Sequence, residues 1–201
     1  MVRIIAGEFR SRRLVSPPSH SVRPTADRVK ESLFEIIRAS PPGASVLDLY
    51  AGCGNLGLEA LSRGAARCLF VERSSACCAL IRRNIEILGL GDKARVMRMD
   101  CARAVKLLAA KGERYDLVFA DPPYAKVAGR ESESKKILRV LEGYDTFAPQ
   151  ARVVIEHFKG DVLREDFLRL VLLGQRRYGD TMVSFFEVKG VTTDLSEASS
   201  K

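Results

Sequence analysis

Apolar and polar residues follow two different periods along this chain, and segments of the two kinds alternate from residue 45 to residue 156. Short apolar runs predict strands, whereas longer stretches with apolar residues three or four positions apart predict helices. Strands separated by helices imply right-handed crossovers and a parallel, doubly wound α/β sheet. The predicted strands are Ser45–Leu49, Cys68–Val71, Arg95–Met99, Leu117–Ala120 and Val153–Glu156, and the predicted helices lie near 56–63, 75–89, 101–111 and 132–142.

The pattern changes after residue 156. Leu168–Tyr178 and Met182–Val188 are both strand-like, and Gly179-Asp180 separates them. Two strands joined by a tight turn predict a hairpin. We therefore expect a mostly parallel seven-stranded sheet with one antiparallel edge strand.

The start of the chain is organised differently from the rest. Arg3–Gly7 and Arg13–Val15 bracket a short turn and predict a small β-hairpin. An amphipathic helix follows, with Thr25 as its N-cap, and it ends before Pro41. We expect three parts: an N-terminal extension (1–40), a main domain (41–190) and a flexible polar tail (191–201).

Positive charge is concentrated in the first 30 residues. The chain carries a net charge of +8, and seven basic against two acidic residues give this segment +5, which leaves +3 for the rest. A basic segment on a nearly balanced domain is typical of a surface that contacts nucleic-acid phosphates, although exposed charges also serve solubility and ion pairs along helices. The predicted polyanion contacts are Arg10, Arg12, Arg13, Arg23 and Arg28.

Composition excludes several classes of protein. With 201 residues, 46% of them apolar, the chain is long enough to bury one full core. It has no apolar stretch of membrane-spanning length and no apolar signal region at its start. Five cysteines without a C-x-x-C pair, and only two histidines, indicate neither a disulfide framework nor a metal site nor a Ser-His-Asp triad. We expect a cytoplasmic monomer without a metal.

A glycine-rich loop follows the first predicted strand. Gly52, Gly54 and Gly57 match the spacing G-x-G-x-x-G, which lets the backbone approach a ligand closely. An acid also follows or ends each of the first four predicted strands of the main domain. Any one of these acids could be only a helix N-cap, but four at the edge where α/β sheets bind ligands indicate a site for a cation-bearing nucleoside. The four acids are Asp48, Glu72, Asp100 and Asp121.

The fourth predicted strand runs into the tetrapeptide Asp121-Pro122-Pro123-Tyr124. The prolines stiffen the turn and donate no backbone N–H. The result is a carboxylate, a carbonyl and an aromatic ring at the lip of the sheet, a set that suits a planar base carrying an exocyclic amine. Asp121 and the Pro122 carbonyl would accept the two amino protons while Tyr124 stacks on the base. A proline-stiffened turn with a capping aspartate is the alternative.

The glycine spacing alone is also that of nicotinamide dehydrogenases, with Glu72 as the ribose-binding acid. Asp48 argues against them, because a carboxylate is a poor neighbour for a pyrophosphate and a good one for an ammonium or sulfonium group. Asp100, beside the Cys101 N–H, is placed to bind an adenine amino group. Spacing and composition thus indicate amino methylation of a base-like substrate, without separating guanine N2 from adenine N6.

Several separated motifs together resemble the class I S-adenosylmethionine-dependent methyltransferases. Within that class the chain is similar to the bacterial small-subunit ribosomal RNA guanine-N2 methyltransferases of the D type. The resemblance runs from about residue 3 to residue 189, on Arg3–Gly7, Arg23–Phe34, Ala51–Ala65 and the D-P-P-Y tetrapeptide, and Cys53 stands where serine is expected.

This resemblance implies a Rossmann-like fold and methyl transfer from S-adenosylmethionine to N2 of a guanine in 16S ribosomal RNA, free or in an assembling small subunit. Asp121, Pro122 and Tyr124 would be the catalytic residues, and the five arginines named above would contact the RNA. The implied cofactor-binding residues are Asp48, Tyr50, Ala51, Gly52, Gly54, Leu56, Gly57, Glu72, Arg73, Asp100 and Cys101.

Three other functions fit parts of the pattern. A DNA adenine methyltransferase usually needs an added recognition domain, for which this chain has no room. A protein glutamine methyltransferase is disfavoured by Asp rather than Asn at position 121 and by the basic N-terminus. A non-catalytic RNA-binding assembly factor on the same scaffold would not need Asp121 and Tyr124.

Overall fold

A seven-stranded sheet forms the centre of the molecule, seen here in a computed structural model that describes residues 2–17, 27–37, 42–124, 131–163 and 167–189. Its strand order is β5-β4-β3-β6-β7-β9-β8, and the neighbours from β5 to β7 are parallel. The strands are β3 (Ser45–Leu49), β4 (Arg67–Glu72), β5 (Ala94–Arg98), β6 (Tyr115–Ala120), β7 (Phe147–Phe158), β8 (Leu170–Tyr178) and β9 (Thr181–Val188).

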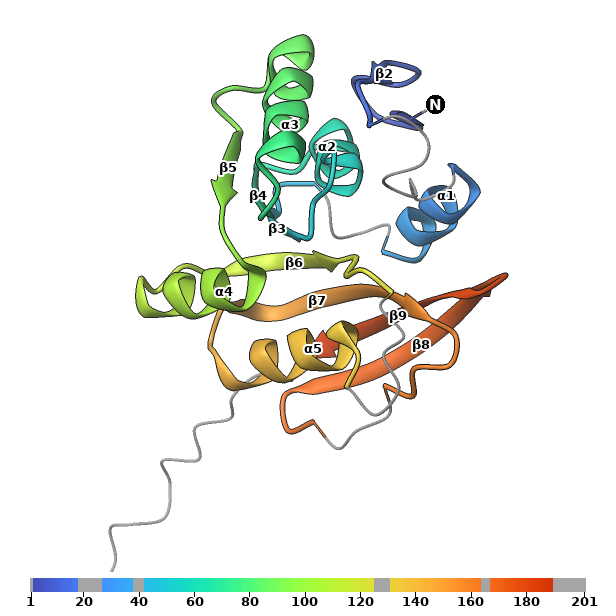
Figure 1. Ribbon diagram of the computed structural model, residues 1–201, viewed down its shortest axis with the longest axis vertical. Helices are drawn as coiled ribbons and strands as arrows, with labels where there is room; N and C mark the ends of the chain where they lie inside the picture. The colour runs from blue at the N-terminus through green and yellow to red at the C-terminus, as the bar shows by residue number, and fades with distance from the viewer. Residues whose placement is uncertain (1, 18–26, 38–41, 125–130, 164–166, 190–201) are drawn as a thin grey trace, which may run out of the picture.

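Helices cover both faces of this sheet (Figure 1). On one face lie α1 (Asp27–Ile36), α2 (Asn55–Ser62) and α3 (Ser75–Leu88), and on the other lie α4 (Cys101–Ala110) and α5 (Glu133–Gly143). Each face has its own apolar cluster, to which neighbouring residues of one strand contribute in turn: Val46 belongs to the first cluster and Leu47 to the second. Because both faces are covered, the central strands are apolar throughout.

The predicted fold class is confirmed, with a refinement at the edge of the sheet. The edge strand β8 pairs antiparallel with β9, as expected, and β9 also pairs antiparallel with β7. The strand that runs against all the others is therefore β9, second from the edge. β7 begins at Phe147 rather than Val153, because Pro149 and the left-handed Gln150 (φ +60°) interrupt the apolar pattern there.

The N-terminal hairpin is shorter than the predicted one. Only β1 (Val2–Arg3) and β2 (Arg13–Leu14) pair. The amides of Ile5 and Ala6 donate to the carboxylate of Glu59 on α2, at 2.8 and 3.0 Å, and so are not available to the opposing strand. The proposed cap Thr25 lies outside the described residues. None of the helices in the described ranges is long and apolar enough to cross a membrane.

Candidate active site

Five carboxylates lie along one edge of the sheet, one from each of five neighbouring strands, and we call this edge the acidic edge. Asp100 follows β5, Glu72 ends β4, Asp48 lies on β3, Asp121 follows β6 and Glu156 lies on β7. These strands are adjacent and parallel, so their carboxyl ends meet at the edge where α/β folds bind ligands. Glu156 was not among the predicted site residues, although it ends the fifth predicted strand and the same rule would have found it.

Asp48 caps helix α2 from the preceding strand. The helix begins at the left-handed Gly54 (φ +85°), which offers no side-chain cap. The Asp48 carboxylate accepts a 2.9 Å hydrogen bond from the Gly57 N–H and thereby satisfies a first-turn donor. A Cβ at position 57 would lie 2.4 Å from a ring carbon of Phe70, so only glycine allows this approach. Burial raises the pKa of Asp48 to about 7, and the Glu72 carboxylate adds to the effect.

Glu72 binds both the loop that follows β3 and the loop that follows β4. Its two carboxylate oxygens accept hydrogen bonds from the Gly52 N–H at 3.0 Å and the Ser74 N–H at 2.8 Å. The loop between β3 and α2 is fixed further by Tyr50, a left-handed residue (φ +57°) whose N–H donates to the Cys101 sulfur at 3.3 Å. Each carboxylate oxygen has two lone pairs, so Glu72 keeps the capacity to accept from hydroxyl groups of a ligand.

The remaining predicted cofactor residues lie in varied environments. Asp100 is exposed, and its carboxylate accepts from the Arg103 N–H at 3.1 Å, which is the N-cap role considered as an alternative. Its contact with an adenine amine stays a prediction. Ala51 and Leu56 have buried side chains, so only their backbone groups could face a ligand, whereas Arg73 is exposed.

The predicted catalytic tetrapeptide lies in the middle of this edge. Asp121 is half-buried, Pro122 is buried, and the Tyr124 hydroxyl donates a 2.8 Å hydrogen bond to Glu156. Burial raises the pKa of Asp121 well above its ordinary value, and the carboxylates of Glu156 and Asp48 raise it further. The edge thus gathers acidic groups whose ionised forms a bound cation would stabilise.

Two buried polar side chains attach the N-terminal segment to the glycine loop. The ammonium group of Lys30 donates to the Asn55 side chain at 2.7 Å and forms an ion pair with Glu59 at 3.2 Å, and both charged side chains are fully buried. The amide of Asn84 binds both the Val15 backbone and, at 3.0 Å, the Cys53 carbonyl. Sequence reasoning missed both residues, because a lysine or an asparagine on an amphipathic helix ordinarily predicts a solvent-facing position.

The predicted RNA-contacting arginines that the structure describes form no ion pair with the carboxylates of the acidic edge. Arg10, Arg12, Arg13 and Arg28 are exposed and form no ion pair within the described ranges, and Arg23 lies outside those ranges. The turn that carries Arg10 is held at the far end of α2, where the Phe9 N–H donates to Ser62 at 3.0 Å. That end of the eight-residue helix is about 12 Å from the glycine loop.

This strand order, with β9 inserted between β7 and β8, is the class I methyltransferase fold, and the glycine loop and the D-P-P-Y turn stand at its ligand-binding edge. The chain belongs to the family described as Conserved hypothetical protein 95, which it matches over residues 2–187.

Relatives agree with this assignment over nearly the whole chain. The chain is 35% identical to the "Putative rRNA methyltransferase YlbH" of Bacillus subtilis, covering 94% of this chain and 100% of that protein. It is 37% identical to the Ribosomal RNA small subunit methyltransferase D of Escherichia coli, covering 77% and 74%. The solved structure described as "Putative methyltransferase yhhF from Escherichia coli" superposes with a TM-score of 0.80 at 32% identity, covering 94% of this chain and 98% of that one.

Proposed function

We propose that this protein transfers a methyl group from S-adenosylmethionine to the exocyclic N2 amine of a guanine in small-subunit ribosomal RNA. The observation that carries the proposal is the position of Asp121 and Tyr124 in the middle of the acidic edge, beside the glycine loop. The names of the relatives support ribosomal RNA as the substrate class. The resemblance of the D-P-P-Y and N-terminal motifs supports the guanine and its N2 amine.

The carboxylates and backbone groups along the acidic edge suit this cofactor. When bound, S-adenosylmethionine would supply a methyl group whose carbon the amine nitrogen attacks, and the electrons of the broken carbon–sulfur bond would leave with S-adenosylhomocysteine. Asp48 and Asp121 are carboxylates whose pKa values are raised by burial and by neighbouring acids, so both would be stabilised in their ionised form by a cation. Glu72 would accept from the ribose hydroxyls, Asp100 and the Cys101 N–H would bind the adenine, and Gly52 to Gly57 would face the methionyl part.

The target base would leave its stack and lie at the acidic edge beside Asp121, since a base inside a helix cannot present its amine in line with the methyl group. Asp121 and the Pro122 carbonyl would accept the two amino protons and so orient the nitrogen lone pair. Tyr124 would stack on the base, an interaction worth about 1–3 kcal/mol on comparable aromatic platforms. The hydrogen bond to Glu156 fixes the end of that ring.

The protonation state of Asp121 would depend on whether the positively charged cofactor is bound. In the free protein, burial and two acidic neighbours favour its protonated form. The pKa of Asp121 would be lower beside a bound sulfonium, so its carboxylate would be a better acceptor for the amine with the cofactor in place. No strong base is needed before attack, and the surplus amine proton leaves late, to Asp121 or to water.

The test is methylation with labelled cofactor of ribosomal RNA from cells that lack this protein, followed by nucleoside analysis. The expected product is N2-methylguanosine in small-subunit RNA. Label in N6-methyladenosine, or only in protein, would overturn the proposal in favour of an adenine or a glutamine methyltransferase. RNA binding without any transfer would instead indicate a non-catalytic assembly factor.

A further inference from the structure

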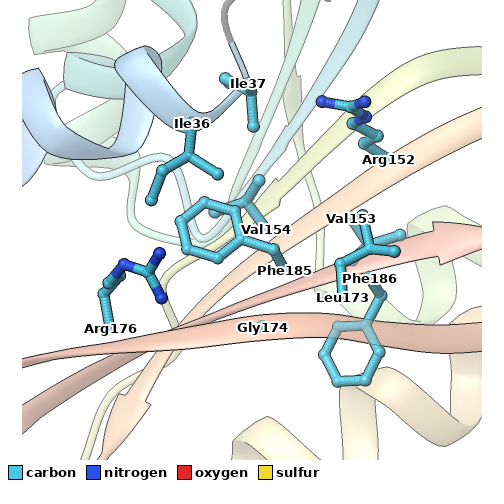
Figure 2. Close-up of a pocket in the computed structure, with 10 residues that line it drawn as sticks. All are labelled: Ile36, Ile37, Arg152, Val153, Val154, Leu173, Gly174, Arg176, Phe185 and Phe186. Carbon is cyan, nitrogen blue, oxygen red and sulfur yellow. The ribbon is translucent and has the colours of Figure 1, made fainter.

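A groove lies on the α1 side of the sheet, beyond the acidic edge. It is a cavity of about 230 Å³ between the C-terminal end of α1 and strands β7, β9 and β8. Val154 and Phe185 form its apolar floor, since both belong to the cluster on this face, and Ile36 and Leu173 form its walls (Figure 2). Its volume is below the roughly 300–1,000 Å³ of typical small-molecule pockets, so its occupant is small or is one part of a larger chain.

Two arginines stand at opposite ends of this groove, Arg152 from β7 and Arg176 from β8 (Figure 2). Arg176 is exposed and donates to the Gln175 carbonyl, and neither guanidinium forms an ion pair with any residue that the structure describes. Glu187 lies across from Arg152 in the β7–β9 register without pairing to it. An apolar floor between two cations matches a nucleotide, whose base has apolar faces and whose chain has a phosphate on either side.

The sheet register connects the groove with the candidate active site. Arg176 pairs with Val183, and Val183 pairs with Glu156, so the three residues form one row across β8, β9 and β7. Directly paired residues share a face, and two strand spacings put the Arg176 and Glu156 backbones about 10 Å apart. Glu156 in turn binds the Tyr124 hydroxyl. The groove therefore opens next to the place where the target base would stack.

We propose that this groove binds a nucleotide of the substrate RNA close to the methylated one. Its base lies on Val154 and Phe185, and its flanking phosphates lie at Arg152 and Arg176. The inference rests on the proposed function and adds an RNA subsite separate from the N-terminal arginines. Gly174 lines the groove, and a Cβ there would meet nothing nearer than the Arg176 guanidinium at 4.0 Å, so a larger side chain would occupy open space in the groove.

The groove can be filled or neutralised without touching the acidic edge. Gly174→Val adds a strand-favouring side chain inside it, so folding should be preserved or improved. Arg152→Gln with Arg176→Gln removes both cations. Arg177→Gln is the matched control, because Arg177 follows Arg176 on β8, is also exposed and, by the alternation of side chains along a strand, points to the opposite face. Calorimetric titration with S-adenosylhomocysteine verifies that each variant keeps an intact cofactor site.

Binding of small-subunit RNA is then measured across a salt series, and KM for that RNA is measured in the transfer assay. The double arginine variant should flatten the plot of log affinity against log salt by about 0.7 per lost phosphate contact on a single strand. Gly174→Val should raise KM for RNA by about tenfold, within the range for loss of one base platform, and leave the salt slope unchanged. Glu187→Gln should strengthen binding, because it removes a carboxylate opposite Arg152.

Two results would overturn this inference. One is a double arginine variant with the wild-type slope together with a Gly174→Val variant with the wild-type KM. The other is an effect of these variants only on particles containing ribosomal proteins, which would assign the groove to a protein. If the wild-type enzyme transfers no methyl group to RNA, the proposed function itself fails, and this is distinguishable because the groove variants then have no activity to change.

Discussion

The hydroxyl of Tyr124 donates a 2.8 Å hydrogen bond to Glu156, a residue 32 positions further along the chain. The hydroxyl of Thr181 on β9 is also within hydrogen-bonding distance of the Tyr124 hydroxyl, at 3.4 Å. The ring that would stack on the target base is thus held by strands β7 and β9, although Tyr124 itself stands in a loop after β6. Its orientation is a property of the sheet and not of the D-P-P-Y turn alone.

The first prediction follows from this bond. Tyr124→Phe keeps the ring but loses the hydroxyl, and Glu156→Leu keeps a side chain of similar length but loses the acceptor. If Glu156 acts by positioning the ring, each change should lower kcat, and the double variant should be little worse than the poorer single variant, because both remove one interaction. Single-turnover rates measure this. Fully additive effects would assign Glu156 a role that does not pass through Tyr124.

The second prediction concerns Asp121. Asp121→Ala should lower the transfer rate by about 10²–10³, the scale for loss of one preorganised group at a reacting atom. Affinity for S-adenosylhomocysteine should change much less, since Asp121 faces the amine. Rapid-quench kinetics and calorimetry separate the two effects. A variant with a near-normal single-turnover rate would show that the carboxylate is structural.

The third prediction concerns pH and Asp48. Its ordinary pKa of 3.8 is raised to about 7 in the folded protein, so the folded state binds this proton more tightly than the unfolded state does. Stability should therefore fall as pH rises from about 4 to about 7, by about 4 kcal/mol from this group, and then level off. Asp48→Asn keeps an acceptor for the Gly57 N–H and should remove that part of the slope. Urea unfolding of both proteins across this pH range is the measurement, and parallel curves would contradict the assignment.

The fourth prediction concerns the buried pair Lys30–Glu59. Glu59 pairs with two cations, and Lys30→Met removes the fully buried one while Arg63 stays at 2.8 Å. The change should therefore cost up to about 3–5 kcal/mol in the free energy of unfolding, the scale for breaking a buried ion pair. The exposed pair Arg83–Glu86 provides the control, since Arg83→Met should change stability by no more than about 0.5 kcal/mol. Hydrogen exchange should also accelerate at the amides of Ile5 and Ala6, which Glu59 binds. Equal stability of the two variants would refute this role for Lys30.

The fifth prediction concerns the N-terminal arginines. Replacing Arg10, Arg12 and Arg13 by alanine should weaken RNA binding and flatten its salt dependence by about 0.7 to 0.9 for each lost phosphate contact. Cofactor affinity should stay the same, because the three side chains are exposed and form no ion pair with the carboxylates of the acidic edge that the structure describes. Folding should change little, since the three side chains are exposed. A wild-type salt slope in the triple variant would mean that RNA contacts the protein elsewhere.

The sequence by itself determined the parallel core and four of the acids on its edge. Val46 and Leu47 belong to an apolar run that does not alternate with polar residues, because both faces of a central strand are covered, and such runs are visible without a structure. Asp48, Glu72, Asp100 and Asp121 share an edge because parallel strands separated by helices all end on the same side. The local periodicity of apolar residues and the rules for connecting parallel strands through helices are sufficient for both conclusions.

Only the tertiary structure decided what those residues contact. Glu156 binds Tyr124, Asn84 binds Cys53 and Val15, and Arg176 stands in one row with Glu156. Each relationship joins segments far apart in the chain, and the row of Arg176 and Glu156 also depends on β9 lying between β7 and β8. Periodicity reports which face of an element is buried, but not which partner covers it, so these contacts depend on packing that no local pattern encodes.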